Sequence, residues 1–229
     1  NPDTALGLTP LNRPTNRQTT TVLSNSFGFG GNNGCLVISK PDRFPLPAAE
    51  PSSSWLAVHG WACLTGAGNT AATIRQLAQG DAVAGTTDLD ASPADLPPRL
   101  VRRLKRLPRM TLSLAQSAHQ DSGLEAAPSS VFLGSGWGAL SETHDFLSRL
   151  TESGEQFPSP TDVVGSVHNG AARQAAIMFG ATGANITVSG GDHSFEQALL
   201  AADLLLDRGG KTALVLGVDE GHQALSPLF

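Results

Sequence analysis

One stretch constrains the fold more than any other: "NITVSGGDHSFEQALLAADLLLDRGG", which begins at Asn185. Its β-branched start predicts a strand that ends at Ser189. The glycine pair that follows predicts a tight turn, and the string "SFEQ" predicts a capping box at the start of a helix near Ser194. Asp192 then stands at the entrance of that helix and feels its positive end. A strand that passes through a glycine turn directly into a helix is the geometry that lifts a nucleophile into a cleft.

The same alternation of strand and helix recurs along the chain. "SVFLGSG" is a second strand that runs into a glycine turn, and "WLAVHGWACL" is typical of a buried strand. Alternating elements of this kind predict βαβ units and a mostly parallel sheet. We expect strands at 55–64, 130–136 and 212–220, and helices at 69–80, 98–122 (kinked at Pro108), 141–150 and 163–179.

Composition excludes several classes of function. Apolar residues make up 40% of the 229 residues, charged residues make up 15%, and the net charge is −5, so the chain is globular and nucleic acid is not an expected partner. No apolar run is long enough to span a bilayer, and no CxxC, HExxH or P-loop occurs. Cys35 and Cys63 are expected to be reduced, buried packing residues of a cytoplasmic protein. We expect no cofactor, no metal and no membrane contact.

Three segments are distinguished by composition. Residues 1–40 form a polar tail with two strands, at 21–25 and 34–39, around a loop rich in glycine and phenylalanine. Residues 41–54 are a linker rich in proline and serine. Residues 55–229 are the α/β unit. Because the chain opens on Asn1 and closes on "GHQALSPLF", we expect it to be a fragment, with the last segment truncated.

The α/β unit resembles the N-terminal half of a β-ketoacyl-ACP synthase of the thiolase fold. "AVHGWACLTGAG", "VFLGSGWGALSETHDFL" and "GKTALVLGVDE" resemble successive strands and turns of that family. "PPRLVRRLKRLPRMTLSLAQSA", "SPTDVVGSVHNGAARQAAI" and "GGDHSFEQALLAAD" are closest to the short chain-length-factor-like synthases of aryl-polyene and polyketide clusters. The resemblance implies one half of a thiolase-like α/β fold: a mixed, mainly parallel sheet with helices on both faces, preceded by a β-hairpin tail.

The tail resembles a different part of the same superfamily. "LTPLN…VLSNSFGFGGNNGCLVISK" is similar to the C-terminal tail of an active ketosynthase, including its gating loop, which maps here to Phe27, Gly28, Phe29, Gly30 and Gly31. The alternative is that this loop only connects the two strands of a hairpin and has no gating role. The part of the family that carries two catalytic histidines and a lysine has no match in this chain.

In the family, the turn before this helix reads T-V-S-x-A-C-x-S, and its cysteine accepts the acyl group. Alignment of the flanking residues places Asp192 at the cysteine position. Asp192 is then either an unusual nucleophile or an aspartate held by the helix dipole without chemistry. No catalytic residue is therefore expected.

Three neighbouring side chains are candidates for an acyl pocket. His193 beside Asp192 is either a base or a polar residue of the turn. His168 and Asn169 would either line the pocket or hold their helix by local hydrogen bonds.

The basic run from Arg99 to Arg109 would either contact an acidic carrier protein or form a solvated helix face.

The resemblance implies a function and partners. The chain would be a non-catalytic subunit of chain-length-factor type that pairs with an active ketosynthase, or with itself, in fatty acid or polyketide (aryl polyene) biosynthesis on acyl carrier protein. The alternatives are an active 3-oxoacyl-ACP synthase fragment and a structural fragment. The dimer edge would be Asn185, Ile186, Thr187, Val188 and Ser189, although a central strand fits the same residues.

Overall fold

The computed structural model describes residues 7, 11, 13–27, 33–41, 43, 56–87, 96–102, 104–156, 159–206 and 209–225. The chain divides into two compact units, residues 1–53 and residues 54–229. Each unit is described by itself. Within the described residues, no helix is long and apolar enough to cross a membrane.

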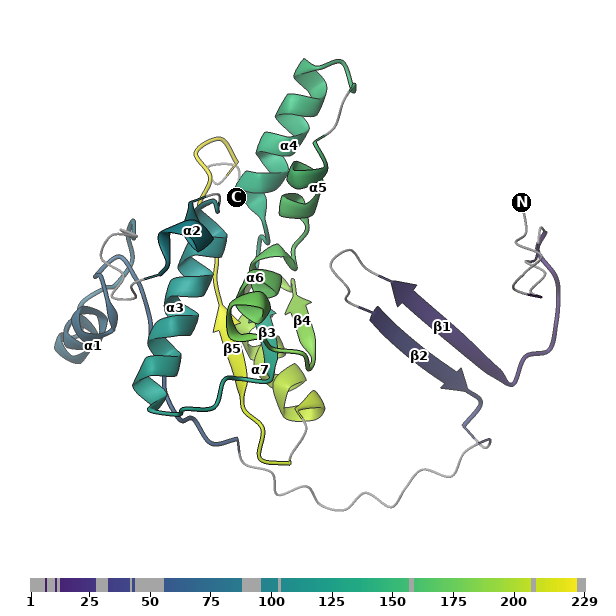
Figure 1. Ribbon diagram of the computed structural model, residues 1–229, viewed down its shortest axis with the longest axis horizontal. Coiled ribbons are helices and arrows are strands. Elements are labelled where there is room, and N and C mark those ends of the chain that lie inside the picture. The colour runs from purple at the N-terminus through teal and green to yellow at the C-terminus, as the bar shows by residue number, and fades with distance from the viewer. Residues whose placement is uncertain are drawn as a thin grey trace. The chain divides into compact units, whose positions relative to one another are not determined.

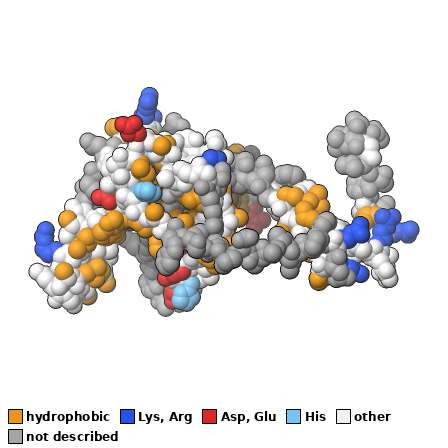
Figure 2. Space-filling model, turned by 90° about the horizontal axis from the view of Figure 1, so that it is seen from below, with side chains coloured by type: hydrophobic (Ala, Val, Ile, Leu, Met, Phe, Trp, Pro, Cys, Tyr) orange, Lys and Arg blue, Asp and Glu red, His pale blue; other side chains and the backbone are white. Residues whose placement is uncertain are grey.

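The first unit contains an antiparallel hairpin of β1 (Thr21–Phe27) and β2 (Asn33–Ser39), in which Thr21 lies opposite Ser39. Both expected strands are confirmed, and both are longer than expected. Figure 2 shows hydrophobic side chains on the surface of this unit. Cys35 is exposed, so the expectation that it is buried is wrong: a two-stranded sheet offers no second layer to cover it.

The second unit is built on a parallel sheet of three described strands. β3 (Ser130–Gly134) is central, with β4 (Asn185–Val188) on one side and β5 (Ala213–Gly217) on the other. Both ladders are parallel, so the carboxyl ends of the three strands meet at one edge. All five residues of β3 are buried, as a strand covered on both faces requires.

Helices cover both faces of this sheet, as expected (Figure 1). On one face, α3 (Arg106–Ser122) and α6 (Gly170–Phe179) pack against Val131, Leu133, Leu214 and Leu216. On the other face, α7 (Ser194–Leu205) brings Ala198 and Ala202 against Phe132. Small alanines at helical spacing allow α7 to approach the sheet closely.

The remaining helices lie around this core: α1 (Thr70–Gln79), α2 (Pro98–Val101), α4 (Leu140–Glu152) and α5 (Pro160–Ser166). The ends of α1 follow the sequence signals closely. The Asn69 side chain accepts a hydrogen bond from the Ala72 N–H at 3.1 Å, and Gly80 ends the helix in the left-handed region at φ 79°.

Two expected helices are interrupted. The helix expected at 98–122 breaks between α2 and α3, not at Pro108, which occupies the first turn of α3, where a missing N–H costs nothing. The helix expected at 163–179 is divided into α5 and α6 by an extended residue, Val167.

The strand expected at 55–64 is absent: residues 56–64 pair with no strand that the structure describes. The Trp61 N–H donates instead to Asp121 of α3 at 3.0 Å, and the Cys63 N–H donates to the Thr70 hydroxyl at 3.0 Å. A run of apolar residues indicates that a segment is buried or extended. The segment forms a β-strand only if the edge of a neighbouring strand is also free to pair with its backbone.

Candidate functional site

Two turns face each other where the strands end. The β3 turn (Ser135–Ala139) follows β3, and the carboxylate of Asp219, just after β5, holds it. Asp219 accepts hydrogen bonds from the Ser135 hydroxyl at 2.9 Å, the Gly136 N–H at 3.0 Å and the Trp137 N–H at 3.1 Å. The Ser135 hydroxyl oxygen in turn accepts from the Gly138 N–H at 2.8 Å. One carboxylate therefore fixes the whole turn.

The β4 turn (Ser189–His193) carries Asp192. A short 3₁₀ turn over Gly191–His193 precedes α7, and both Asp192 and His193 are exposed. Ser194 is buried, and its hydroxyl donates to the Gly191 carbonyl at 2.6 Å while accepting from the Gly190 N–H at 2.9 Å. The expected capping box is therefore wrong, because Ser194 bonds back into the turn and the N-cap is His193.

The structure separates the candidates for the acyl pocket. The ring of His168 lies against Gly138, where an added Cβ would come within 1.5 Å of the His168 Nδ1. The Asn169 amide donates to the Asn185 side chain at 3.1 Å and to the Thr187 hydroxyl at 3.3 Å. These contacts fit the local packing and hydrogen-bonding alternative for His168 and Asn169, and their place in an acyl pocket stays a prediction.

Two buried acidic groups lie where α4 begins. Glu142 and Glu220 are 7% and 5% exposed, and Glu220 accepts a hydrogen bond from the Ser141 N–H at 3.0 Å. Burial raises the pKa of Glu142, and the nearby Glu220 carboxylate adds to the rise. Sequence reasoning missed Asp219 and Glu220, because it placed both inside the strand expected at 212–220, whereas β5 ends at Gly217 and both residues follow it.

A polar cluster lies further along α4. Ligand atoms of His144, Asp145 and His222 all lie within 4.8 Å of one another, which is a spacing compatible with a metal ion. Asp145 also forms an ion pair with Lys105, and this hydrogen bond lowers the pKa of Asp145. Sequence reasoning did not find this cluster, because His222 is remote from α4 in the sequence.

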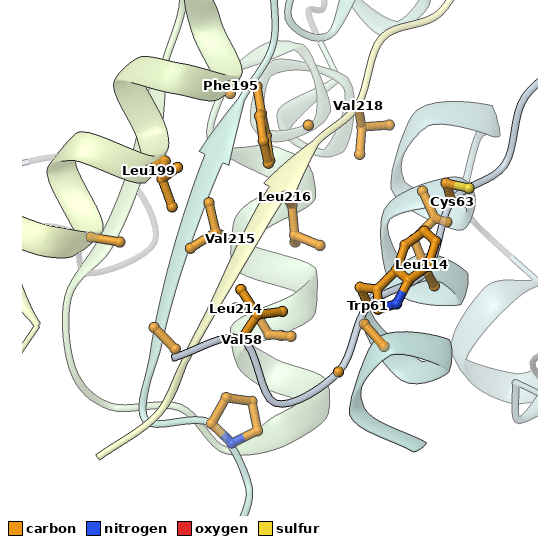
Figure 3. Close-up of a pocket in the computed structure, with 18 of the residues that line it drawn as sticks. Val58, Trp61, Cys63, Leu114, Phe195, Leu199, Leu214, Val215, Leu216 and Val218 are labelled. Carbon is orange, nitrogen blue, oxygen red and sulfur yellow. The ribbon is translucent and has the colours of Figure 1, made fainter. Parts of the chain in front are cut away.

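A cavity with a volume of about 1210 Å³ lies among the described residues of the second unit. It runs along β5 between residues 56–64, the end of α3 and α7, and one end reaches Asp192 and Trp137. Figure 3 shows its mainly apolar lining. His168, Asn169 and His193 do not line it. The cavity therefore runs from the β4 turn along β5, which pairs with β3 alone among the strands that the structure describes.

Comparison with known proteins gives the family. Residues 75–225, more than half of the chain, match the family described as "Beta-ketoacyl synthase, N-terminal domain". The chain belongs to the β-ketoacyl synthase family. The expected resemblance is therefore confirmed, and the parallel sheet between two helical layers is a partial thiolase-like fold.

Two solved structures resemble this synthase-family chain. One chain from the complex of the ketosynthase ApeO with its chain length factor ApeC, from Xenorhabdus doucetiae, is similar to this chain. The two are 24% identical over 71% of the present chain, with a TM-score of 0.57. A chain of the ishigamide ketosynthase/chain length factor is 25% identical over 68%, with a TM-score of 0.54. The present chain spans 66% and 50% of these two chains. The search of curated proteins gives no match.

Other predictions for this synthase-family chain fall partly outside the described residues. Gly28, Phe29, Gly30 and Gly31 of the expected gating loop lie there, and Phe27 is described only as the last residue of β1. In the basic run, Arg99 and Arg102 are exposed, as expected. Arg106 is half-buried and donates to the Thr87 hydroxyl at 2.8 Å, so the expectation that it points outward is wrong.

Proposed function

We propose that this chain is a non-catalytic subunit of chain-length-factor type that pairs with an active ketosynthase and shapes the acyl path of that partner. The observation that carries the proposal is Asp192. It is exposed on the turn between β4 and α7, at the position that corresponds by resemblance to the acyl-accepting cysteine. The likeness to chains of ketosynthase and chain-length-factor complexes supports the pairing.

The chemistry of Asp192 argues against acyl transfer. A thiolate attacks a thioester readily and gives a stable thioester product, whereas a carboxylate gives a labile anhydride. The side chain of Asp192 has no hydrogen bond to another described residue that would position it as a nucleophile. We infer that the turn kept its shape without its reactive group.

The acyl path would hold a growing acyl chain on acyl carrier protein, in fatty acid or polyketide biosynthesis of the aryl-polyene kind, in the cytoplasm. The exposed Arg99 and Arg102 at α2 are the proposed contact for the acidic carrier. His193, exposed beside Asp192, is a proposed contact for the acyl group.

The outer edge of β4 is the proposed partner interface. Hydrogen bonds from the Val131 N–H to the Ala184 carbonyl (2.8 Å) and from the Ser135 N–H to the Val188 carbonyl (3.0 Å) show which residues of this segment face β3. Backbone groups alternate in direction along a strand, so Ile186 also faces β3, whereas the N–H and carbonyl of Thr187 point to the outer edge. A partner strand would pair with them there.

The first test measures acyl transfer from radiolabelled acyl-ACP, and condensation with malonyl-ACP. We expect neither reaction from the purified chain. Asp192→Cys is expected to gain acyl transfer without condensation, because the decarboxylating residues are missing. Glu196→Cys, on the exposed first turn of α7, controls for indiscriminate acylation of a thiol. Covalent acyl-enzyme at Asp192, or product above the blank, would overturn the proposal.

The second test uses two proline substitutions one residue apart. Thr187→Pro removes a donor from the outer edge and leaves the β3 ladder intact, so it should abolish the complex while the chain stays folded. Ile186→Pro removes a ladder donor and should destabilise the fold itself. Size-exclusion chromatography with light scattering, with and without a ketosynthase such as ApeO, gives the assembly state. An unchanged complex with Thr187→Pro would rule out pairing through this edge.

A further inference from the structure

Two histidines and a carboxylate gather beside α4, where distant parts of the chain meet. His144 and Asp145 lie on α4, and His222 lies in the segment after β5, which Figure 1 shows beside the base of α4. One ligand atom from each side chain lies within 4.8 Å of the other two, and all three residues are half-buried. We call these three residues the α4 cluster.

A hydrogen bond beside the α4 cluster brings its two parts together. The Glu220 carboxylate accepts from the Ser141 N–H at 3.0 Å, which ties the segment after β5 to the first turn of α4. The ring centroids of His144 and His222 lie 4.3 Å apart, with 42° between the ring planes. The fold therefore places the two imidazoles side by side before any ligand binds.

The spacing of His144 and Asp145 suits a metal ion better than a hydrogen bond. The His144 Nδ1 is buried and has no hydrogen-bond partner within the described part of the chain, and Asp145 Oδ1 lies 3.5 Å from it. An ordinary hydrogen bond between nitrogen and oxygen is shorter, at about 2.9 Å. Two ligands that each lie about 2.1 Å from a tetrahedral zinc ion are roughly 3.4 Å apart. The two atoms are therefore spaced as neighbouring ligands of one ion would be.

The other contacts of the α4 cluster are compatible with a bound metal. Lys105 pairs with Asp145 Oδ2, which orients the carboxylate and leaves Oδ1 towards His144, as outer partners do in metal sites. The His222 Nδ1 accepts from the Ala224 N–H at 3.2 Å. A neutral imidazole has one nitrogen lone pair to offer, so His222 gives up this exposed local bond when it binds a metal through either nitrogen.

We propose that the α4 cluster binds one divalent transition-metal ion of the zinc class through His144, Asp145 and His222, with water as a further ligand. Imidazole nitrogens favour Zn²⁺, Co²⁺ and Ni²⁺, whereas Mg²⁺ and Ca²⁺ prefer oxygen. The ion would connect α4 to the segment after β5 and stabilise the fold. The expectation of no metal considered only motifs of close spacing such as HExxH. The inference does not rest on the proposed function, which uses the turn and the edge of β4.

The test is a titration of the tag-free chain with Co²⁺ and then Zn²⁺, after chelation has removed bound metal. We expect one Co²⁺ per chain, with the visible absorption of a cobalt site that has nitrogen ligands, and displacement by Zn²⁺. Zn²⁺ should raise the Tm, whereas Mg²⁺ at the same concentration should not. His144→Gln and His222→Gln should each weaken Zn²⁺ binding at least about tenfold in calorimetry, since even partners outside the ligand set contribute that much.

Three further variants locate the ion. His59→Gln and Cys35→Ser remove exposed ligand groups outside the α4 cluster, and both should bind Zn²⁺ as the unmodified chain does. His222→Cys replaces a nitrogen ligand by a thiolate, so it should keep the binding and add a charge-transfer band from sulfur to cobalt. This gained band distinguishes the loss of a ligand from the loss of the fold.

Two outcomes would overturn the proposal. The first is that the unmodified chain binds neither Co²⁺ nor Zn²⁺ at one ion per chain, a result that needs no variant. The second is that His144→Gln and His222→Gln, shown by circular dichroism to fold, bind Zn²⁺ as tightly as the control variants. The protein would then hold an adventitious ion only.

Discussion

The β3 turn and the β4 turn have similar sequences and different constraints. Both leave a parallel strand through glycines and lead towards a helix. In the β3 turn, Asp219 accepts three hydrogen bonds, two of them from successive backbone N–H groups. In the β4 turn, Asp192 is exposed, and the Ser194 hydroxyl ties the turn to its helix. Asp219 therefore holds its turn, whereas the Asp192 side chain makes no hydrogen bond within the described part of the chain.

At the same edge of the sheet, the aspartate that stabilises the fold is therefore a different residue from the aspartate that is exposed and available for function. A side chain that holds a turn is not available for chemistry, whereas an exposed side chain at the mouth of a cavity is. Loss of a reactive group at the β4 turn would therefore leave the fold unaffected. The comparison predicts a graded series of effects from substitutions at the two turns.

The largest effect is expected at Gly134, where β3 enters its turn. An added Cβ would come within 2.3 Å of the Ser194 carbonyl oxygen, a backbone atom of α7. Gly134→Ala should lower the free energy of unfolding by about 3 kcal/mol, since the helix must move off the strand. Urea unfolding measures it. Gly170→Ala is the control, because its nearest contact is 3.4 Å away, and similar losses in both variants would contradict the argument.

Asp219→Ala should cost about 2 kcal/mol of folding stability, since it leaves the donors of Ser135, Gly136 and Trp137 without their acceptor. Asp219→Asn keeps one acceptor oxygen and should lose less. Urea midpoints of the two variants give the order. If Asp219→Ala unfolds at the same urea concentration as the unmodified chain, the turn is not held by this carboxylate.

Glu142, in the first turn of α4, makes the stability of the fold depend on pH. Its folded-state pKa lies above the ordinary value of 4.5, so the folded state holds the proton more tightly than the unfolded state. This contribution to stability is complete below pH 4.5 and is lost as pH rises through the folded-state pKa. Glu142→Gln should remove that loss, which a pH series of thermal unfolding measures.

Asp145→Asn tests a contribution to stability that changes with pH in the opposite direction from that of Glu142. The hydrogen bond from Lys105 lowers the pKa of Asp145 below 3.8, so its contribution is present above that pH and is lost as pH falls. A Glu142→Gln profile parallel to that of the unmodified chain would show that Glu142 does not titrate within the transition.

The smallest effect is expected at Asp192. Asp192→Ala should change the free energy of unfolding by less than about 0.5 kcal/mol, because the side chain is exposed and holds no other described group. Binding to a ketosynthase should also persist, since the proposed interface is the edge of β4. A loss of stability comparable to that of Asp219→Ala would erase the distinction between the two turns.

Much of the α/β unit could be predicted from local sequence. Asn69 and Gly80 mark the ends of α1 by capping chemistry, and the apolar runs at β3 and β5 locate buried strands. These signals act within a few residues, so they can be identified without knowledge of the partner elements. The same local patterns do not reveal where a helix will be interrupted, as between α2 and α3.

The sequence by itself determined the order of strands and helices, the glycine turns and the absence of a thiol at residue 192. Only the tertiary structure decided that Asp219 holds the β3 turn, that Asn169 supports β4, and that residues 56–64 run beside β5 without pairing. The physical reason is that these contacts join residues far apart in the chain. Their formation depends on which edges and donors the packed helices leave open, and no local pattern encodes that.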